Sequence, residues 1–354
     1  MYDWANSTYN LVITSTIFPA YYVAITTSSD PNSLSYVDFF GLKIINTALQ
    51  NYALAFVFLI VAITSPIMSS IADYRGNKKQ FLRFFCTMGS LACASLYFFD
   101  SNHIMGGLFS VIVACVGFWG SLVFYNSYLP EIASPADRDR ISAKGFMMGY
   151  IGSVILLVIC LYLIIGRTNE EAIHAMKLSF VFTGIWWALF SQYTFYYLPK
   201  GNKKNVTITK DFIFKGFNEL RLVWKQLQEN LALKRYLYSY FVFIMAVQTV
   251  MLVATYFGAT EVAWETPSQK TTGLIISILL IQLVAVLGAY ITSKASAKYG
   301  NINTLIFLNT FWAILCGFAY FIETPIHFYT TAAFVGLVMG GIQSLARSTY
   351  SKLL

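Results

Sequence analysis

Long apolar segments alternate with short polar ones along the whole chain. The ten apolar stretches run over residues 8–25, 52–71, 81–99, 104–122, 145–165, 178–198, 236–257, 272–290, 304–322 and 328–345. An α-helix needs about 20 apolar residues to cross the hydrocarbon core of a bilayer. The pattern therefore predicts ten transmembrane helices and an all-α polytopic membrane protein.

The composition agrees with this pattern, since 57% of the residues are hydrophobic, 11% are charged and the mean hydropathy is +0.60. The first apolar stretch differs from a secretion signal, because residues 1–7 contain no Lys or Arg and no small-residue cleavage pattern follows the stretch. We interpret it as the first retained span.

The basic residues fall mainly on one side of the predicted spans. With a cytoplasmic amino terminus, the inner side collects 20 of the 24 Lys and Arg residues, and only Lys43, Arg167, Lys177 and Lys270 lie outside. This asymmetry is the usual signature of cytoplasmic loops, and one missed span would invert every later loop. The net charge of +8 is thus dispersed over several inner loops, which predicts contact with anionic lipid headgroups and not with nucleic acid.

Motifs for enzyme chemistry are missing from the sequence. The five cysteines lie inside predicted spans without C-x-x-C spacing, and the three histidines are single residues in predicted outer loops. No zinc, acyl-transfer or nucleotide-binding motif occurs. A membrane enzyme acting on lipid would need a carboxylate cluster or a reactive histidine in the bundle. We therefore expect a non-enzyme without metal or cofactor.

One polar segment divides the chain. Residues 199–210 read PKGNKKNVTITK, a breaker-rich sequence typical of a linker. We predict an N-terminal six-helix half over 1–198, a cytoplasmic linker over 199–235 and a C-terminal half with four helices over 236–354. Apolar residues at steps of three and four over 211–233 predict an amphipathic helix, either on the membrane surface or packed as an ordinary linker helix.

Two corresponding loops carry a weak internal repeat. Ser69 precedes Gly76 by seven residues after the second span, and Ser293 precedes Gly300 by seven residues after the eighth. Carriers built from two related halves show such repeats. In the first loop Asp73, Arg75, Gly76 and Lys78 are candidate gating residues. The alternative is that these charges only fix the topology of the loop.

The first of these loops resembles the G-x-x-x-D-x-x-G-[RK]-[RK] loop of the major facilitator superfamily, with Ser69 and Asn77 as departures. The opening Tyr2-Asp3-Trp4-Ala5-Asn6-Ser7 is similar to that of its vacuole-effluxer-like branch, which includes the autophagy-related amino-acid effluxers of fungi. The resemblance implies a bundle of twelve helices, of which this chain contains ten, so we expect a fragment. It also implies a monomeric transporter of a small polar solute. The fungal members of the branch are amino-acid effluxers. The location is then the plasma (inner) membrane in a bacterium or the vacuolar membrane in a fungus.

In that superfamily the first, fourth, seventh and tenth spans line the cavity. Asn10, Asn126 and Gln248 are the strongest substrate-binding candidates, because an amide both donates and accepts and is costly to leave in lipid. Further candidates on these spans are Tyr125, Thr249, Gln343 and Arg347. For single hydroxyls the alternative is a hydrogen bond between helices.

Acidic residues offer one coupling candidate. All 16 fall in loops or at span ends, and Asp3, at the start of the first span, is the candidate for ion coupling. A carboxylate at a helix start also has a purely structural explanation, because the helix dipole and free backbone amides favour it there.

The sequence leaves two functions open for a protein of this type. The first is a secondary active or facilitative transporter working by alternating access. The second is a non-transporting membrane scaffold or sensor on the same fold, which would lose activity with linker variants and keep it when cavity amides are changed.

The charge distribution predicts which loops are cytoplasmic. Residues 73–79, 130–144 and 200–235 should lie inside, and residues 28–49, 167–177 and 261–270 outside, because cytoplasmic loops carry the excess of Lys and Arg. A single cysteine at position 203 should react with an impermeant maleimide only after the membrane is opened. Labelling of that cysteine from outside intact cells would overturn the orientation.

Overall fold

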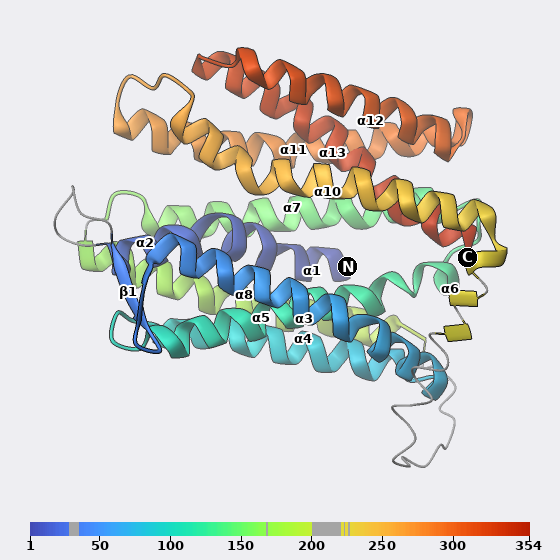
Figure 1. Ribbon diagram of the computed structural model, residues 1–354, viewed down its shortest axis with the longest axis horizontal. Helices are drawn as coiled ribbons and strands as arrows, with labels where there is room; N and C mark the ends of the chain where they lie inside the picture. The colour runs from blue at the N-terminus through green and yellow to red at the C-terminus, as the bar shows by residue number, and fades with distance from the viewer. Residues whose placement is uncertain (28–34, 168, 200–220, 223, 226) are drawn as a thin grey trace. The chain divides into compact units, whose positions relative to one another are not determined.

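The computed structural model describes residues 1–27, 35–167, 169–199, 221–222, 224–225 and 227–354 (Figure 1). The elements up to the middle of the chain are α1 (Tyr2–Thr8), the π-helix η1 (Tyr9–Ile17), α2 (Phe18–Thr26), β1 (Tyr36–Phe39), β2 (Leu42–Ile45), α3 (Asn46–Arg75), α4 (Lys78–Ser95), the 3-10 turn η2 (Leu96–Phe98), α5 (Ile104–Asn126), α6 (Leu129–Ile132), α7 (Arg138–Ile164) and α8 (Asn169–Tyr197). The later elements are α10 (Leu231–Thr260), α11 (Pro267–Tyr299), α12 (Asn301–Phe318), the 3-10 turn η3 (Ala319–Phe321) and α13 (Pro325–Leu353).

These elements form two compact units. The first contains Met1–Asn126 and Ile155–Trp224, and the second contains Ser127–Val154 and Lys225–Leu354. Helix α7 belongs to both, because its residues up to Val154 are part of the second unit and its residues from Ile155 onward are part of the first. The halves predicted over 1–198 and 236–354 stay a prediction for the domain organisation.

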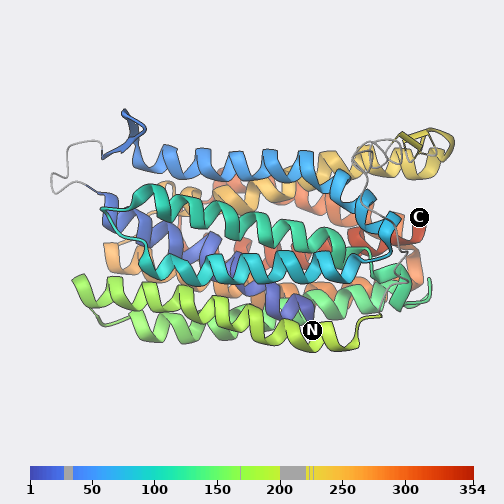
Figure 2. The ribbon, with the colours of Figure 1, turned by 90° about the horizontal axis from the view of Figure 1, so that it is seen from below.

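In the first unit α4 packs against both α5 and α8, and α3 packs against α5 (Figures 1 and 2). The contact between α4 and α5 is close because two glycines, Gly89 and Gly117, face each other, so a Cβ atom on either would meet the backbone of the other. Small residues allow such close approach between helices in lipid, where packing and not hydrophobicity drives association. The helical run α1, η1 and α2 packs against α8.

In the second unit α11 and α13 make the most extensive helix contact. Gly336 and Gly340 of α13 lie against the backbone of Ile281 and Ala285 of α11, and Gly288 of α11 lies against Leu337 of α13. This row of glycines brings the two backbones together along several turns. Helix α12 packs on the outside of the pair.

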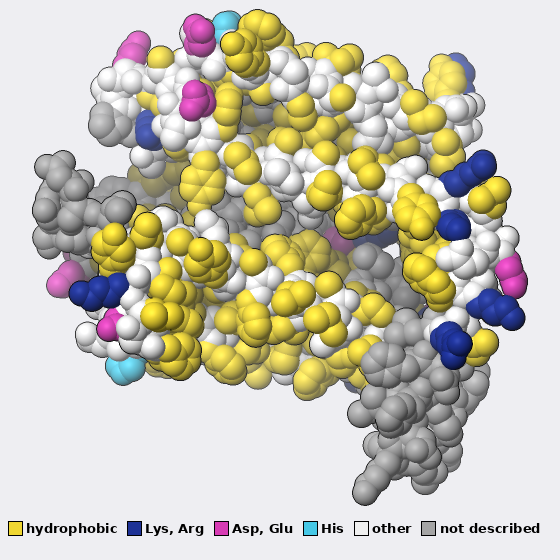
Figure 3. Space-filling view, viewed as in Figure 1, with side chains coloured by type: hydrophobic (Ala, Val, Ile, Leu, Met, Phe, Trp, Pro, Cys, Tyr) yellow, Lys and Arg dark blue, Asp and Glu magenta, His cyan; other side chains and the backbone are white. Residues whose placement is uncertain are grey.

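Among the described residues, nine helices are long and apolar enough to cross a membrane. The first predicted span adds a helical run over residues 2–26 that is divided into α1, η1 and α2. In both units the charged side chains visible in Figure 3 lie mostly at helix ends, with hydrophobic side chains along the lengths between them. The prediction of an all-α polytopic membrane fold is confirmed.

Local details differ from the sequence-based expectation. The predicted outer loop before α3 contains a hairpin, with β1 antiparallel to β2 and a two-residue turn at Phe40 and Gly41, both with positive φ. Such turns match the twist of the paired strands. Helix α3 begins at Asn46, before the apolar stretch at 52, and α13 continues past 345 to Leu353.

The glycines of the two repeated loops both have a positive φ. Gly76 follows α3 with φ of +64°, and Gly300 follows α11 with φ of +82°. A positive φ after a helix is strongly favoured by glycine, which lacks the Cβ atom that would clash. The linker helix predicted over 211–233 lies largely outside the described residues.

The close packing of α11 on α13 leads to a stability prediction. Gly340→Ala should destabilise the protein by about 1–3 kcal/mol, the usual cost of overpacking a tight contact, because the new Cβ would meet the Ala285 carbonyl. Gly317→Ala on α12 is the control, since a Cβ there has open space. The midpoint of thermal unfolding in detergent should fall for the first variant only; equal midpoints would contradict the packing argument.

Candidate functional site

The first span has one aromatic face and one polar face. Tyr2, Tyr9 and Phe18 are buried, and a second row formed by Ser7, Asn10, Thr14 and Ser15 is exposed or half-buried. Polar groups are costly to expose to hydrocarbon, so polar residues in spans face the bundle interior or a water-filled path. The polar face of α1 and η1 is therefore the first candidate surface for a solute.

Most of this polar face lies on η1, a π-helix over Tyr9–Ile17. The wider turn shows in the hydroxyl of Thr16, which donates to the carbonyl of Leu11 five residues earlier at 2.8 Å. Long π-helical runs are rare and are frequently found at functional sites. The sequence carried no signal for this distortion.

Asp3 is a buried carboxylate next to the polar face. Its side chain is 4% exposed, and the hydroxyl of Tyr125, near the end of α5, donates to its Oδ2 atom at 2.6 Å. The ring of Tyr125 also lies 4.8 Å from that of Tyr2, and Trp4 stacks on Trp186 of α8 at 5.5 Å. Aromatic side chains from three helices thus fix α1 in place and hold an ionisable group inside the first unit.

Asn126, another predicted binding residue of this unit, is the last residue of α5. It is exposed and directly follows Tyr125, the partner of Asp3. Asn10 is exposed on η1. Two of the three predicted amides of the site are therefore accessible at surfaces of the first unit.

In the second unit Gln343 and Arg347 of α13 both contact α7. Arg347 donates from Nε to the hydroxyl of Ser142 at 3.0 Å and from Nη2 to the Ser142 carbonyl at 2.9 Å, and its guanidinium lies 4.3 Å from the centre of the Phe146 ring. Tyr150 donates its hydroxyl to Oε1 of Gln343 at 2.8 Å. These three α7 residues were missed by the sequence analysis. Their spacing of four residues, which matches that of Gln343 and Arg347, was the available signal.

The remaining predicted residues of this unit lie on α10. Gln248 is half-buried, whereas Thr249 is exposed and donates its hydroxyl to the Met245 carbonyl of its own helix at 2.8 Å. Thr249 therefore has the ordinary intrahelical hydrogen bond of a hydroxyl in a span. The convergence of Asn10, Asn126 and Gln248 on one cavity involves both units and stays a prediction.

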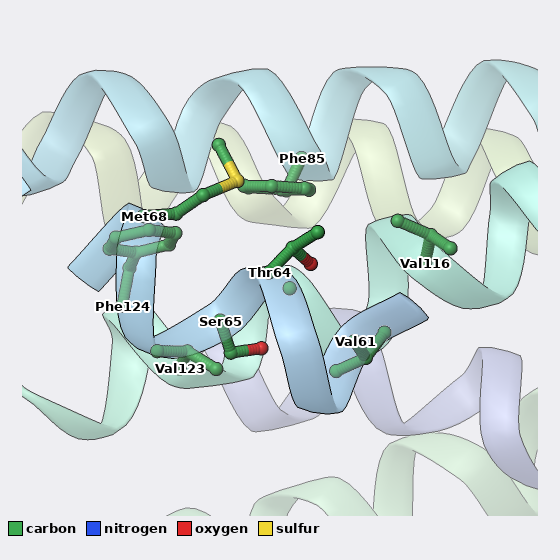
Figure 4. Close-up of a pocket in the computed structure, with 9 residues that line it drawn as sticks. Val61, Thr64, Ser65, Met68, Phe85, Val116, Val123 and Phe124 are labelled. Atoms are coloured by element: carbon green, nitrogen blue, oxygen red, sulfur yellow. The ribbon is translucent and has the colours of Figure 1, made fainter. Parts of the chain in front are cut away.

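A small pocket between α3, α4 and α5 does not suit a polar solute (Figure 4). Its polar side chains are Thr64 and Ser65, and the rest of its lining is apolar. The hydroxyl of Thr64 already donates to the Ile60 carbonyl at 2.7 Å. The pocket offers no charge to a zwitterion and few hydrogen-bonding groups to a sugar, so it is not our candidate site.

The predicted gating loop is described in part. Gly76 forms the turn, and Lys78, at the start of α4, is half-buried. The side chains of Asp73 and Arg75 lie outside the described residues. Lys79 is buried and donates to the Leu198 carbonyl at the end of α8 at 2.6 Å, so this loop is anchored within the first unit.

Within the described part of the chain no group of three or more His, Cys, Asp or Glu residues is placed to hold a metal ion. The ionisable groups of interest are instead single side chains with protein partners. The chemistry available is hydrogen bonding and charge pairing, which suits reversible binding.

A family model for vacuole effluxers of the Atg22-like type matches residues 1–354, the whole chain. The chain belongs to the Atg22-like vacuole effluxer family. An uncharacterised MFS-type transporter of Bacillus subtilis, YxiO, is 31% identical over all of this chain and 79% of its own length. Autophagy-related protein 22 of Yarrowia lipolytica is 20% identical over 90% of this chain and 67% of its own length.

Two solved transporters of the major facilitator superfamily resemble this Atg22-like protein. The fucose:proton symporter FucP of E. coli aligns with a TM-score of 0.62 at 12% identity, over 99% of this chain and 85% of its own. The partially occluded xylose transporter XylE of E. coli aligns with a TM-score of 0.52 at 11% identity, over 99% and 85% of the two chains. The predicted superfamily fold is confirmed, and the protein is a multi-pass membrane transporter and not an enzyme.

Proposed function

We propose that this Atg22-like protein moves a small polar solute across the membrane by alternating access, with amino acids as the first candidates. The observation that carries the proposal is the polar face of Ser7, Asn10, Thr14 and Ser15, exposed or half-buried on the first span. A face of this kind is costly in hydrocarbon and favourable along a solute path.

The charges of the two units favour a solute that carries both signs. Asp3 in the first unit offers a carboxylate to an ammonium group, and Arg347 in the second offers a guanidinium to a carboxylate. Arginine binds carboxylates with two parallel hydrogen bonds. The amides of Asn10, Asn126 and Gln248 are each suited to hydrogen-bond the polar atoms of such a solute.

The same proposal includes the setting in which transport takes place. We expect a monomer with a cytoplasmic amino terminus, in the plasma membrane of a bacterium or the vacuolar membrane of a fungus. The direction of transport, into or out of the cytoplasm, is set by the gradients of the solute and of any coupled ion. The protein only changes conformation, and its ligands shift that equilibrium only through their different affinities for its states.

Transport of a defined solute is the direct test. The full-length protein, reconstituted in liposomes, should exchange one or more radiolabelled amino acids from a panel that also contains fucose and xylose. Asn10→Leu should lower kcat/KM about 10- to 100-fold, since a hydrogen bond to a charged group contributes about 1.5–3 kcal/mol. Asn309→Leu is the matched control, because Asn309 donates to the Leu305 carbonyl of its own helix α12.

No exchange of any panel member by well-folded protein would contradict the proposal and favour the scaffold or sensor. Equal losses in the two variants would remove Asn10 from the site. A sugar in place of an amino acid as the transported solute would retain the transporter and reject the zwitterion.

Asp3 leads to a separate prediction about coupling. If this carboxylate carries the coupling proton, Asp3→Asn should abolish accumulation driven by a pH gradient and leave solute exchange intact, because the amide mimics the protonated state. Tyr125→Phe, which removes the donor to Asp3, should weaken the gradient dependence without abolishing it. Gradient-driven accumulation that survives in Asp3→Asn would exclude Asp3 as the coupling group.

A further inference from the structure

Buried polar atoms without a hydrogen-bond partner occur in the first unit where α1 packs against α8. Among the described residues, they include the hydroxyl of Tyr2 on α1 and, on α8, the indole nitrogen of Trp187 and the hydroxyl of Ser191. Tyr2 is 1% exposed, and Trp187 and Ser191 are 0% exposed. Nearly all buried polar groups in native proteins are paired, so three unpartnered groups on two packed helices need an explanation.

The three groups belong to one polar cluster. The hydroxyl of Tyr2 faces the polar side chains of Trp187, Ser121 and Cys86. The Cys86 thiol in turn faces Ser191. Ser121 already donates to a carbonyl of its own helix at 2.7 Å, which leaves Tyr2, Trp187 and Ser191 as the members in need of a partner. The cluster therefore joins side chains from α1, α4, α5 and α8.

Direct bonds do not satisfy these groups. An indole N–H only donates, whereas a hydroxyl both donates and accepts, so Tyr2 would accept from Trp187 if the two were in contact. They face each other without the length and angle of a hydrogen bond. A water molecule between the two groups explains such spacing. Ring packing maintains it, because Tyr9 also lies against Trp187, with ring centres 5.5 Å apart.

The chemistry of the cluster indicates the class of its ligand. None of its five side chains carries a formal charge, so an ion would be buried there without a counter-charge, which is costly. The cluster offers one N–H donor and two hydroxyls that donate or accept. A buried water molecule makes about three hydrogen bonds to otherwise unpaired polar groups. Water is the smallest neutral molecule that both donates and accepts, and it matches this set of groups.

We propose that Tyr2, Trp187 and Ser191 bind at least one water molecule between α1 and α8, and that this water is part of the contact that holds α1 in the first unit. The ring of Tyr2 packs on that of Tyr125, whose hydroxyl donates to Asp3. The bound water therefore supports the ring contact beside this carboxylate. The proposal does not depend on transport, and neither does its test.

Cys86 is a natural reporter of this water. An X-ray pulse splits water into hydroxyl radicals, which oxidise the nearest reactive side chain, and thiols are readily oxidised. Cys93 is the control on the same helix, since it is also buried and donates its thiol to the Phe180 carbonyl at 3.5 Å. In the full-length protein, with a scavenger of bulk radicals, Cys86 should be oxidised at least about threefold faster than Cys93, because only Cys86 lies beside the proposed water.

Two serines of α8 test whether the oxidation of Cys86 depends on the proposed water. Ser191→Ala removes one partner of the water and should slow the oxidation of Cys86 towards the rate of Cys93. Ser179→Ala is the matched control, because Ser179 is also 0% exposed and donates to the Ala175 carbonyl of its own helix at 3.0 Å. Its Cys86 oxidation rate should equal that of the wild-type protein.

Equal oxidation of Cys86 and Cys93 in the wild-type protein would overturn the proposal. An unchanged Cys86 rate in Ser191→Ala, or an equal fall in Ser179→Ala, would also overturn it. If Ser191→Ala does not fold, Tyr2→Phe takes its place, with the same expected fall and the same contrary result.

Thermal unfolding of Tyr2→Phe tests the water by a second measurement. Removing a buried hydroxyl that has no partner relieves a desolvation cost and should raise the midpoint of unfolding. Removing a hydroxyl that bonds to a bound water loses a hydrogen bond and leaves the water short of a partner. We therefore expect a lower midpoint in Tyr2→Phe than in the wild-type protein. An equal or higher midpoint would indicate a dry cluster and reject the water site.

Discussion

Hydrocarbon cannot hydrogen-bond, and this constraint governs where polar side chains lie in the described spans of this protein. Many hydroxyls meet it within their own helix, as Ser179 and Thr183 do by donating to the carbonyls of Ala175 and Ser179 at 3.0 and 2.8 Å. Such groups cost little and indicate no function. The informative residues are those whose hydrogen-bonding groups find no partner within their own helix, above all Asp3, Asp139 and Arg347. Each of these three has partners on another helix.

The two units hold their buried polar side chains with different kinds of helix contact. In the first unit aromatic rings from α1, α5 and α8 pack against one another beside Asp3, and the Tyr125 hydroxyl donates a hydrogen bond to it. In the second unit glycines bring α11 and α13 together, and polar side chains join α13 to α7. Rings fill space and hold one arrangement, because they pack tightly and have few rotatable bonds. In the second unit the contact of α13 with α7 is instead made by hydrogen bonds of Ser142, Tyr150 and Arg347.

Sequence reasoning succeeded where the signal was local. Hydropathy located the spans, and the spacing of Ser69 to Gly76 and Ser293 to Gly300 identified two turns that share a positive φ at glycine. It failed where partners are distant along the chain. Asp139 was one acidic residue among many at span ends, because nothing near it in the sequence indicates Lys352, which is 213 residues away. The π-helix η1 was likewise invisible, since hydropathy does not distinguish one helical pitch from another.

Arg347 is the candidate site residue whose contacts in the second unit involve the most partners. It lies five residues before Lys352 on the same helix, and both side chains contact the first two turns of α7, at Ser142 and Asp139. Two of the guanidinium donors of Arg347 are directed at Ser142, and one face of the guanidinium is covered by Phe146. If Arg347 binds a solute carboxylate as we propose, that carboxylate competes with these partners for the same donors. Solute binding at Arg347 and separation of α7 from α13 would then favour each other, and linkage requires the effect to be equal in both directions.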